Sequence, residues 1–325
     1  MSALKVNWSR QLWHAIGVAV ASLTCVAAVA QTVPPMEPIR VSENSYYVQG
    51  LAALGSPKNQ NFISNAGFVI AKEGVVVVDA LGSPALAARL VQAIAKITPK
   101  PITHVVVTHY HADHIYGLQT FKALGAQIIA HDAAREYIYS DTARLRLEAS
   151  RVDLAPWIDD KTAITQPDQW VKGGETLKLA GTDFYLALVG PSHTPEDLAV
   201  WVPSERVLFS GDLIFNGRLP FVGKADSSHW IKALDTMLSF DAIAVVPGHG
   251  RWSDNPKADI SLMRDYLSYL RQSMGTAVEN LTPFDEAYDA TDWGRFQSVP
   301  MFKFANRMNA YNTYLLMENE GLRAK

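Results

Sequence analysis

The segment Val105–Gly117, VVVTHYHADHIYG, decides how the chain folds around its chemistry. The three valines that open it predict a buried strand that ends where the polar residues begin. Alternate side chains of an extended chain point to one side, so His109, His111 and Asp113 can converge on one small volume. His114 faces a different way and can serve a second ion. Core packing does not call for these groups, because each buried polar group needs a partner. The pattern therefore favours metal binding over its alternative, a solvated histidine-rich loop.

Three further side chains that can bind metal directly follow predicted apolar strands, each beside a glycine. They are His193 in GPSHTPED, Asp212 in FSGDLIF and His249 in VVPGHG. Strand ends at one edge of a sheet are where a rigid scaffold presents groups to a site. Taken singly, each has another interpretation, a turn residue that hydrogen-bonds its own backbone. Taken with the first cluster, all three favour a larger metal site. Asp79, which closes VVVVDA, is expected to hold the 109–114 loop by hydrogen bonds rather than to bind metal.

The hydrophobic pattern predicts an α/β (α+β) fold with two sheets that are covered by helices on their outer faces. Predicted strands are residues 40–49, 62–71, 75–79, 102–108, 127–130, 175–179, 184–189, 198–202, 207–209 and 243–246. Predicted helices are residues 84–97, capped by Ser83, 115–124, 228–238, 260–274 and 302–318. Residues 132–171 mix charged and aromatic residues, and we expect them to be mostly helical or irregular and to lie over the mouth of the site.

The first 30 residues have the pattern of a secretory signal peptide. Lys5 and Arg10 give a basic start, the run from Ala15 to Ala30 has no charge, and Ala28-Val29-Ala30 is a small-residue cleavage signal before Gln31. An uncleaved anchor is the alternative, but a run of 16 apolar residues is short for a spanning helix. The sequence therefore predicts a periplasmic or secreted protein with no stable membrane span after cleavage. The only cysteine, Cys25, lies in this segment, so imidazole and carboxylate must hold any metal.

The mature chain is expected to form one domain over residues 31–255, with residues 256–325 as a helical extension packed on it. Loss of two cationic residues with the signal moves the formal net charge from −3 to −5. Such a mildly acidic protein lacks the basic surface of a nucleic-acid-binding protein, so we expect a small-molecule substrate. Nothing in the sequence indicates the oligomeric state.

Four motifs occur in a fixed order: THYHADH, GPSHTPED, SGDLIF and PGHG. In this order they resemble the metallo-β-lactamase superfamily over about residues 40–255. The resemblance implies a four-layer αβ/βα sandwich with a metal centre of the hydroxyacylglutathione-hydrolase type. Exported members with this layout resemble the zinc hydrolases found near periplasmic quinoprotein and sulfur-oxidation systems. Lactamases with a cysteine at position 212 are not matched. Flavodiiron proteins, with Glu in place of His111, and nucleases, with a domain inserted after Asp212, are not matched either.

The resemblance also implies how the ligands are shared between two ions. One ion is held by His109, His111 and His193; the second is held by Asp113, His114 and His249; Asp212 bridges both. Such ligands suit two Zn²⁺ ions, although iron and manganese also accept them.

Two zinc ions that share an oxygen ligand lower the pKa of bound water toward neutrality. We therefore expect an exported hydrolase in which a bridging hydroxide attacks an ester, thioester or lactam carbonyl and Asp113 orients it. The alternatives are a persulfide dioxygenase with one iron on His109, His193 and Asp212, a β-lactamase, and a non-catalytic periplasmic metal-binding accessory protein.

Substrate choice is expected to depend on loops around the strand ends. Leu51–Asn61 can fold over the metals as a flap. Aromatic side chains predicted to line an apolar pocket, each with ordinary core as its other interpretation, are Tyr110, Tyr116, Trp157, Phe215 and Phe221. No clustered cationic set announces an anion site, and the only candidates are Arg218, Lys224 and Arg251.

Overall fold

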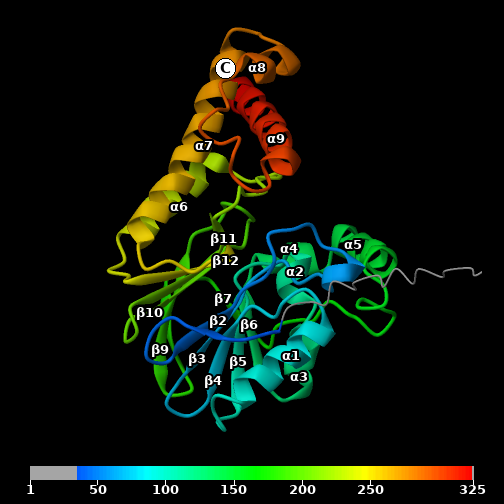
Figure 1. Cartoon of the computed structure of the whole chain (residues 1–325), viewed down its shortest axis with the longest axis vertical. Helices are drawn as coiled ribbons and strands as arrows, with labels where there is room; N and C mark the ends of the chain where they lie inside the picture. Colours follow the sequence, from blue (N-terminus) through cyan, green and yellow to red (C-terminus); the bar gives the residue numbers. More distant parts are fainter. Residues whose placement is uncertain (1–34, 324–325) are drawn as a thin grey trace, which may run out of the picture. The chain divides into compact units, whose positions relative to one another are not determined.

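Two β-sheets pack face to face, and helices cover the outer face of each sheet (Figure 1). The computed structural model describes residues 35–323, which belong to a single compact unit. The predicted signal peptide, Cys25 and the cleavage site at Ala30 lie outside the described residues. In the part of the chain that the structure describes, no helix is both long and apolar enough to cross a bilayer.

The first sheet has seven strands in chain order. β1 to β4 are antiparallel neighbours, and β4 to β7 are parallel, with helices crossing over between them. The strands are β1 (Ile39–Arg40), β2 (Ser45–Val48), β3 (Ala66–Ile70), β4 (Val75–Val78), β5 (Ile102–Val106), β6 (Gln127–His131) and β7 (Gln169–Val171).

The second sheet has five strands in the order β12-β11-β10-β9-β8. Its edge pair, β11 and β12, is parallel, whereas the others are antiparallel. The strands are β8 (Glu175–Leu179), β9 (Thr182–Leu188), β10 (Leu198–Val202), β11 (Val207–Asn216) and β12 (Ala244–Gly250).

Helices form the two outer layers and the C-terminal extension. They are η1 (Pro57–Asn59), α1 (Pro84–Ala95), α2 (Ala112–Ile115), α3 (Leu118–Ala123), α4 (Ala134–Ile138), α5 (Asp141–Asp153), α6 (Ser227–Leu238), α7 (Pro256–Glu279), α8 (Phe284–Ala290) and α9 (Phe302–Arg323). Ser83 caps α1, as the sequence predicts, because its side chain accepts a hydrogen bond from the Leu86 amide.

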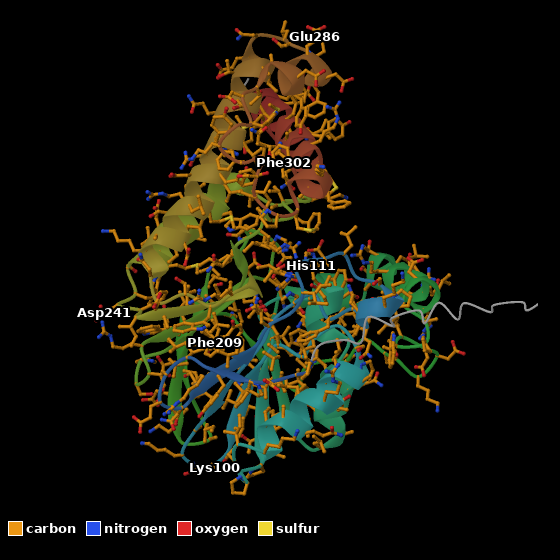
Figure 2. All side chains as sticks on the ribbon, in the orientation of Figure 1. Lys100, His111, Phe209, Asp241, Glu286 and Phe302 are labelled. Carbon is orange, nitrogen blue, oxygen red and sulfur yellow. The ribbon has the colours of Figure 1, made fainter. Side chains whose placement is uncertain are left out.

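Alternation along the strands produces three apolar layers. In β4, Val75 and Val77 face α1 and α3, whereas Val76 and Val78 face the second sheet. Phe209 of β11 lies in the layer between the sheets (Figure 2). The opposite face of the second sheet packs on α6 and α7, and α8 and α9 extend that cluster. The predicted four-layer sandwich with a helical extension is confirmed; the predicted boundary at residue 255 stays a prediction.

Three predicted elements differ from the observed ones. The single strand predicted over 40–49 is two strands, β1 and β2, joined by a turn. The helix predicted to begin at Ile115 begins at Ala112 and is interrupted after Ile115, so Asp113 and His114 lie in α2. The strands predicted to end at 209 and 246 continue to Asn216 and Gly250. Their glycine-containing continuations break the apolar pattern, which is why the sequence placed the ends too early.

The C-terminal extension holds the loop that follows β11. Asn309 of α9 is fully buried, and its side chain accepts a hydrogen bond from the Val222 amide (2.8 Å) and donates one to the Pro220 carbonyl (2.7 Å). The Leu219 amide donates to the Pro300 carbonyl (2.9 Å). A helix close to the end of the chain thus fixes the backbone of residues 219–222.

Candidate metal centre

Seven side chains predicted as ligands come together at one end of the sandwich. His111, just after β5, and Lys100, just before it, lie at opposite ends of the fold (Figure 2). The side chains form two groups whose ligand atoms lie within 4.8 Å of one another in each group. One group is His109, His111, His193 and Asp212; the other is Asp113, His114 and His249.

The backbone explains how residues that are distant in sequence meet. His109 and His111 follow β5, and α2 turns the chain so that Asp113 and His114 face the second group. Asp212 and His249 lie within β11 and β12, which are parallel neighbours, and not after the strands as the sequence suggested. The pairing shifts register around Gly211, whose φ of +53° favours glycine. A Cβ at Gly248 would collide with the Asp212 carboxylate.

Ligand atoms in the first group are spaced as a tetrahedral metal site requires. Bonds of 2.0–2.1 Å in a tetrahedron place neighbouring ligand atoms roughly 3.3 Å apart. His111 Nδ1 lies 3.0 Å from His193 Nε2. Asp212 Oδ2 lies 3.4 Å from His193 Nε2 and 3.7 Å from His109 Nε2.

The second group has similar spacings. His249 Nε2 lies 3.3 Å from Asp113 Oδ2, and His114 Nε2 lies 3.7 Å from the same oxygen. Asp212 also contacts this group: its Oδ1 is 3.1 Å from His114 Nε2, and its Oδ2 is 3.3 Å from His249 Nε2. One carboxylate therefore touches both groups.

Buried atoms without a hydrogen-bond partner show that the site fits a metal. Among the residues that the structure describes, they include His109 Nε2, His114 Nε2 and Asp212 Oδ1. Leaving such atoms buried and unsatisfied costs about 1–3 kcal/mol each. The three atoms face the same volume as the other ligand atoms, so a bound cation would satisfy them together.

Hydrogen bonds on the opposite ring nitrogens turn the imidazoles toward this volume. His114 Nδ1 lies 2.9 Å from Asp79 Oδ2, and His249 Nδ1 lies 2.6 Å from the Ile63 carbonyl oxygen. Since these oxygens only accept, each Nδ1 donates, and a neutral ring keeps its lone pair on Nε2. Thr108 donates its hydroxyl to Asp79 (2.8 Å) and lies 3.0 Å from His109 Nδ1. Asp79 thus orients two imidazoles, in the position that the sequence assigned to it.

The two groups differ in their protonation. Burial lowers the pKa of His109 well below its usual 6.5, and burial together with the charge of His111 lowers the pKa of His193 to about 3. Burial opposes the charged form of His114 too, but Asp212, Asp113 and Asp79 raise its pKa well above 6.5. The pKa of His249 is raised, because Asp212 and Asp113 outweigh its burial. The first group presents neutral imidazoles, whereas the second attracts positive charge.

Both carboxylates stay ionised. Burial opposes ionisation of Asp212, but His249, His114 and His109 hold its pKa well below the usual value. His114 and His249 lower the pKa of Asp113 in the same way.

Two predicted pocket residues belong to the core. Tyr110 and Tyr116 are each 1% exposed and pack in the apolar cluster beneath α1 and α3. Their hydroxyls contact the Thr165 carbonyl and the Ser150 hydroxyl, so the expectation that they line a pocket is wrong.

The other three aromatic residues lie in different settings. Phe215 stacks on His249, with ring centroids 4.9 Å apart and planes at 6°, and borders the metal centre. Phe221 is half-buried on the loop held by α9. Trp157 is half-buried and donates its indole N–H to the Pro57 carbonyl (2.8 Å), which joins it to the predicted flap segment 51–61.

Sequence reasoning missed two residues that support the centre. Asn65 is buried and donates to the Pro247 (2.7 Å) and Gly250 (2.8 Å) carbonyls, which ties the His249 segment to the first sheet. Trp230 of α6 is fully buried, and its ring lies 5.2 Å from that of His193. A polar residue just before an apolar strand is a faint signal for Asn65; Trp230 has the pattern of ordinary helix core.

The metallo-beta-lactamase superfamily model matches residues 60–249, more than half of the chain, so the chain belongs to this superfamily. A metallo-beta-lactamase type 2 from Elizabethkingia meningoseptica is 23% identical over 273 residues, which cover 82% of this chain and 96% of that protein. Its relatives and its paired His/Asp groups define the general class of a metal-dependent hydrolase.

Two solved structures show the same fold. A metallo-beta-lactamase from Pontibacter korlensis has a TM-score of 0.56 and 22% identity, covering 71% of this chain and 98% of that one. The stereoselective inverting sec-alkylsulfatase Pisa1 from Pseudomonas sp. has a TM-score of 0.67 and 19% identity, covering 86% of this chain and 50% of that one. This chain therefore spans about half the length of the sulfatase.

We predict that Asp79→Asn weakens zinc binding by about 10- to 100-fold, the usual effect of losing a hydrogen bond that orients a ligand. The amide cannot supply the negative charge that holds the His114 ring. Competition with a chromophoric chelator measures the affinity, and Asp183→Asn, an exposed carboxylate on β9, is the matched control. Equal affinities for Asp79→Asn and the control would contradict this role.

We also predict that zinc binding releases protons and tightens as the pH rises. His114 and His249 have raised pKa values, so they hold protons near neutral pH that a metal must displace. Calorimetric titrations in two buffers with different ionisation enthalpies, at about pH 6 and about pH 8, count the protons released. His229→Ala, at an exposed histidine of α6, should behave as the wild type; binding that releases no protons at either pH would refute the prediction.

Proposed function

We propose that this chain is an exported hydrolase with two zinc ions that cleaves an ester, thioester or lactam. The observation that carries the proposal is the Asp212 carboxylate, which lies 3.4 Å from His193 in one group and 3.1 Å from His114 in the other. A carboxylate shared in this way bridges two ions. The assignment of His109, His111 and His193 to one ion, and of Asp113, His114 and His249 to the other, is part of the proposal.

Two such ions, when bound, supply a lowered pKa for coordinated water and polarise a carbonyl oxygen. The protein supplies the geometry and the proton acceptor. Asp113 has 17% of its side chain exposed, whereas Asp212 has 5%, so Asp113 is the ionised carboxylate that reaches the open side of the centre. The Ser64 hydroxyl donates to the Asp113 carbonyl (2.5 Å) and fixes its backbone. Asp113 is therefore placed to orient the attacking water and accept its proton.

The second group favours this proposal over a single-iron dioxygenase. An iron on His109, His193 and Asp212 would leave His114 and His249 with no function, yet both are buried and their Nδ1 atoms are held by hydrogen bonds. The same completeness weighs against a purely accessory metal-binding role. Lactam cleavage stays within the proposal, as one of three carbonyl classes.

We predict that metal-quantified protein contains two zinc ions per chain and hydrolyses at least one member of a panel of esters, thioesters, lactams and an alkyl sulfate. Asp113→Asn should lower kcat by about 100- to 10,000-fold, as expected for loss of a general base. Asp132→Asn, on the surface beside β6, is the control.

Other outcomes separate the alternatives. One iron per chain with oxygen uptake on persulfides would establish a dioxygenase instead. Absence of turnover on every panel member by the zinc-loaded protein would favour the accessory role. Cleavage of the alkyl sulfate alone would retain the two-metal centre and overturn the carbonyl substrate.

The proposed export has a separate test. Expression in a bacterial host should give a periplasmic protein whose N-terminal sequence begins at Gln31, since cleavage is expected after Ala30. Recovery of the full-length chain from the membrane fraction would support the uncleaved anchor instead.

A further inference from the structure

A buried arginine beside the metal centre has no partner that accounts for it. Arg218 lies on the loop between β11 and α6 and is 4% exposed. Its Nη1 is buried without a hydrogen-bond partner, and its Nε is 3.5 Å from the carbonyl of the adjacent Leu219. No carboxylate of residues 35–323 forms a salt bridge with it. An unpaired charge is among the most costly groups to bury, so this guanidinium calls for an anion.

Aromatic rings connect Arg218 to the centre. Its guanidinium carbon lies 5.7 Å from the ring centroid of Phe215 and 5.4 Å from that of Phe221. Phe215 also stacks on His249, and its ring lies 5.9 Å from that of His193. The guanidinium is therefore one aromatic ring away from both groups of ligands.

Charges around Arg218 show why the centre does not satisfy it. Burial lowers the pKa of Arg218, and the only opposing charges are those of Asp212 and Asp113. In the proposed function these two carboxylates are bound to dications. Two dications outweigh two carboxylates, so the loaded centre is itself positive and Arg218 adds a further positive charge.

The loop carrying Arg218 is built rigidly. Asn309 and Pro300, contributed by α9 and the segment before it, hold the backbone at Leu219, Pro220 and Val222 by three hydrogen bonds of 2.7–2.9 Å. Asn309 also donates to the Tyr266 hydroxyl (3.0 Å), which fixes it to α7. Holding a charged side chain in one place lowers the entropy that a ligand must remove on binding.

We propose that Arg218 binds a carboxylate of the substrate, so that this hydrolase acts on carbonyl compounds that carry a carboxylate. The planar guanidinium matches a carboxylate with two parallel hydrogen bonds. Phe215 and Phe221 shield this pair from water and strengthen it. The inference rests on the proposed function for its reaction, but not for the binding itself.

The kinetic test uses matched pairs of substrates. Each pair has the same cleavable ester, thioester or lactam and carries either a carboxylate or its neutral primary amide. The wild type should prefer the carboxylate, and Arg218→Gln should lower its kcat/KM on the order of 30-fold or more, as for removal of one partner of a buried charge pair. Rates on the amide should change little.

Two further variants sharpen the result. Arg218→Lys keeps the charge without the planar fork and should recover part of the loss. Arg251→Gln removes an exposed arginine near the late motifs and should leave the preference intact. Loss of the preference in Arg251→Gln but not in Arg218→Gln would overturn the assignment.

A binding experiment keeps the inference separate from the reaction. Calorimetry measures the Kd of succinate for zinc-loaded and metal-free protein, with circular dichroism and zinc content confirming that each variant is folded and loaded. We expect succinate to bind the zinc-loaded wild type, with a Kd on the order of 30-fold or more higher for Arg218→Gln. Succinate binding that is the same in both proteins would show that the ions alone hold the carboxylate and would overturn the inference.

The two proposals fail differently. If no panel compound is hydrolysed while succinate binds in an Arg218-dependent way, the proposed reaction falls and the anion site stands. If hydrolysis occurs without preference for the carboxylate and Arg218→Gln is silent, the hydrolase stands and the anion site falls.

Discussion

The structure depends on one electrostatic constraint: two ionised carboxylates and five imidazoles share a buried volume. Asp212 lies within 3.1–3.7 Å of ligand nitrogens in both groups. Protons alone satisfy this arrangement poorly, since His109 and His193 resist protonation. The surroundings follow from it: Gly248 leaves room for the Asp212 carboxylate, Asp79 orients two rings, and Asn65 anchors the His249 segment. Each is a local condition for keeping the ligand atoms close together.

Much of this was predictable, because strand periodicity and ligand chemistry are both local in sequence. The valines of β4 and β5 predict the sheet, and the 109–114 cluster predicts the metal centre. The errors arise where tertiary contacts decide. Asp212 and His249 were expected beyond their strands, but parallel pairing of β11 with β12 continues the strands through glycines that interrupt the apolar pattern. Tyr110 and Tyr116 are adjacent to ligands in sequence, yet their rings turn into the core, and no periodicity distinguishes that from a pocket.

Groups that act across the fold were out of reach of the sequence. Asn65 contacts residues more than 180 positions away, and Asn309 contacts a loop almost 90 positions away. Arg218 could be recognised as a cation near the late motifs, but its unusual feature is its missing partner. A missing partner becomes visible only when every neighbouring side chain has a position.

Metal binding and substrate choice draw on different parts of this chain. Every proposed metal ligand lies between residues 109 and 249, inside the segment that matches the superfamily. The backbone around Arg218 and Phe221 is fixed by Pro300 and Asn309, which lie outside that segment. Likeness to a lactamase or a sulfatase therefore bears on the centre and says little about the loop beside it. The C-terminal helices are best understood as part of the substrate side of the site, because they set where its one unpaired buried guanidinium lies.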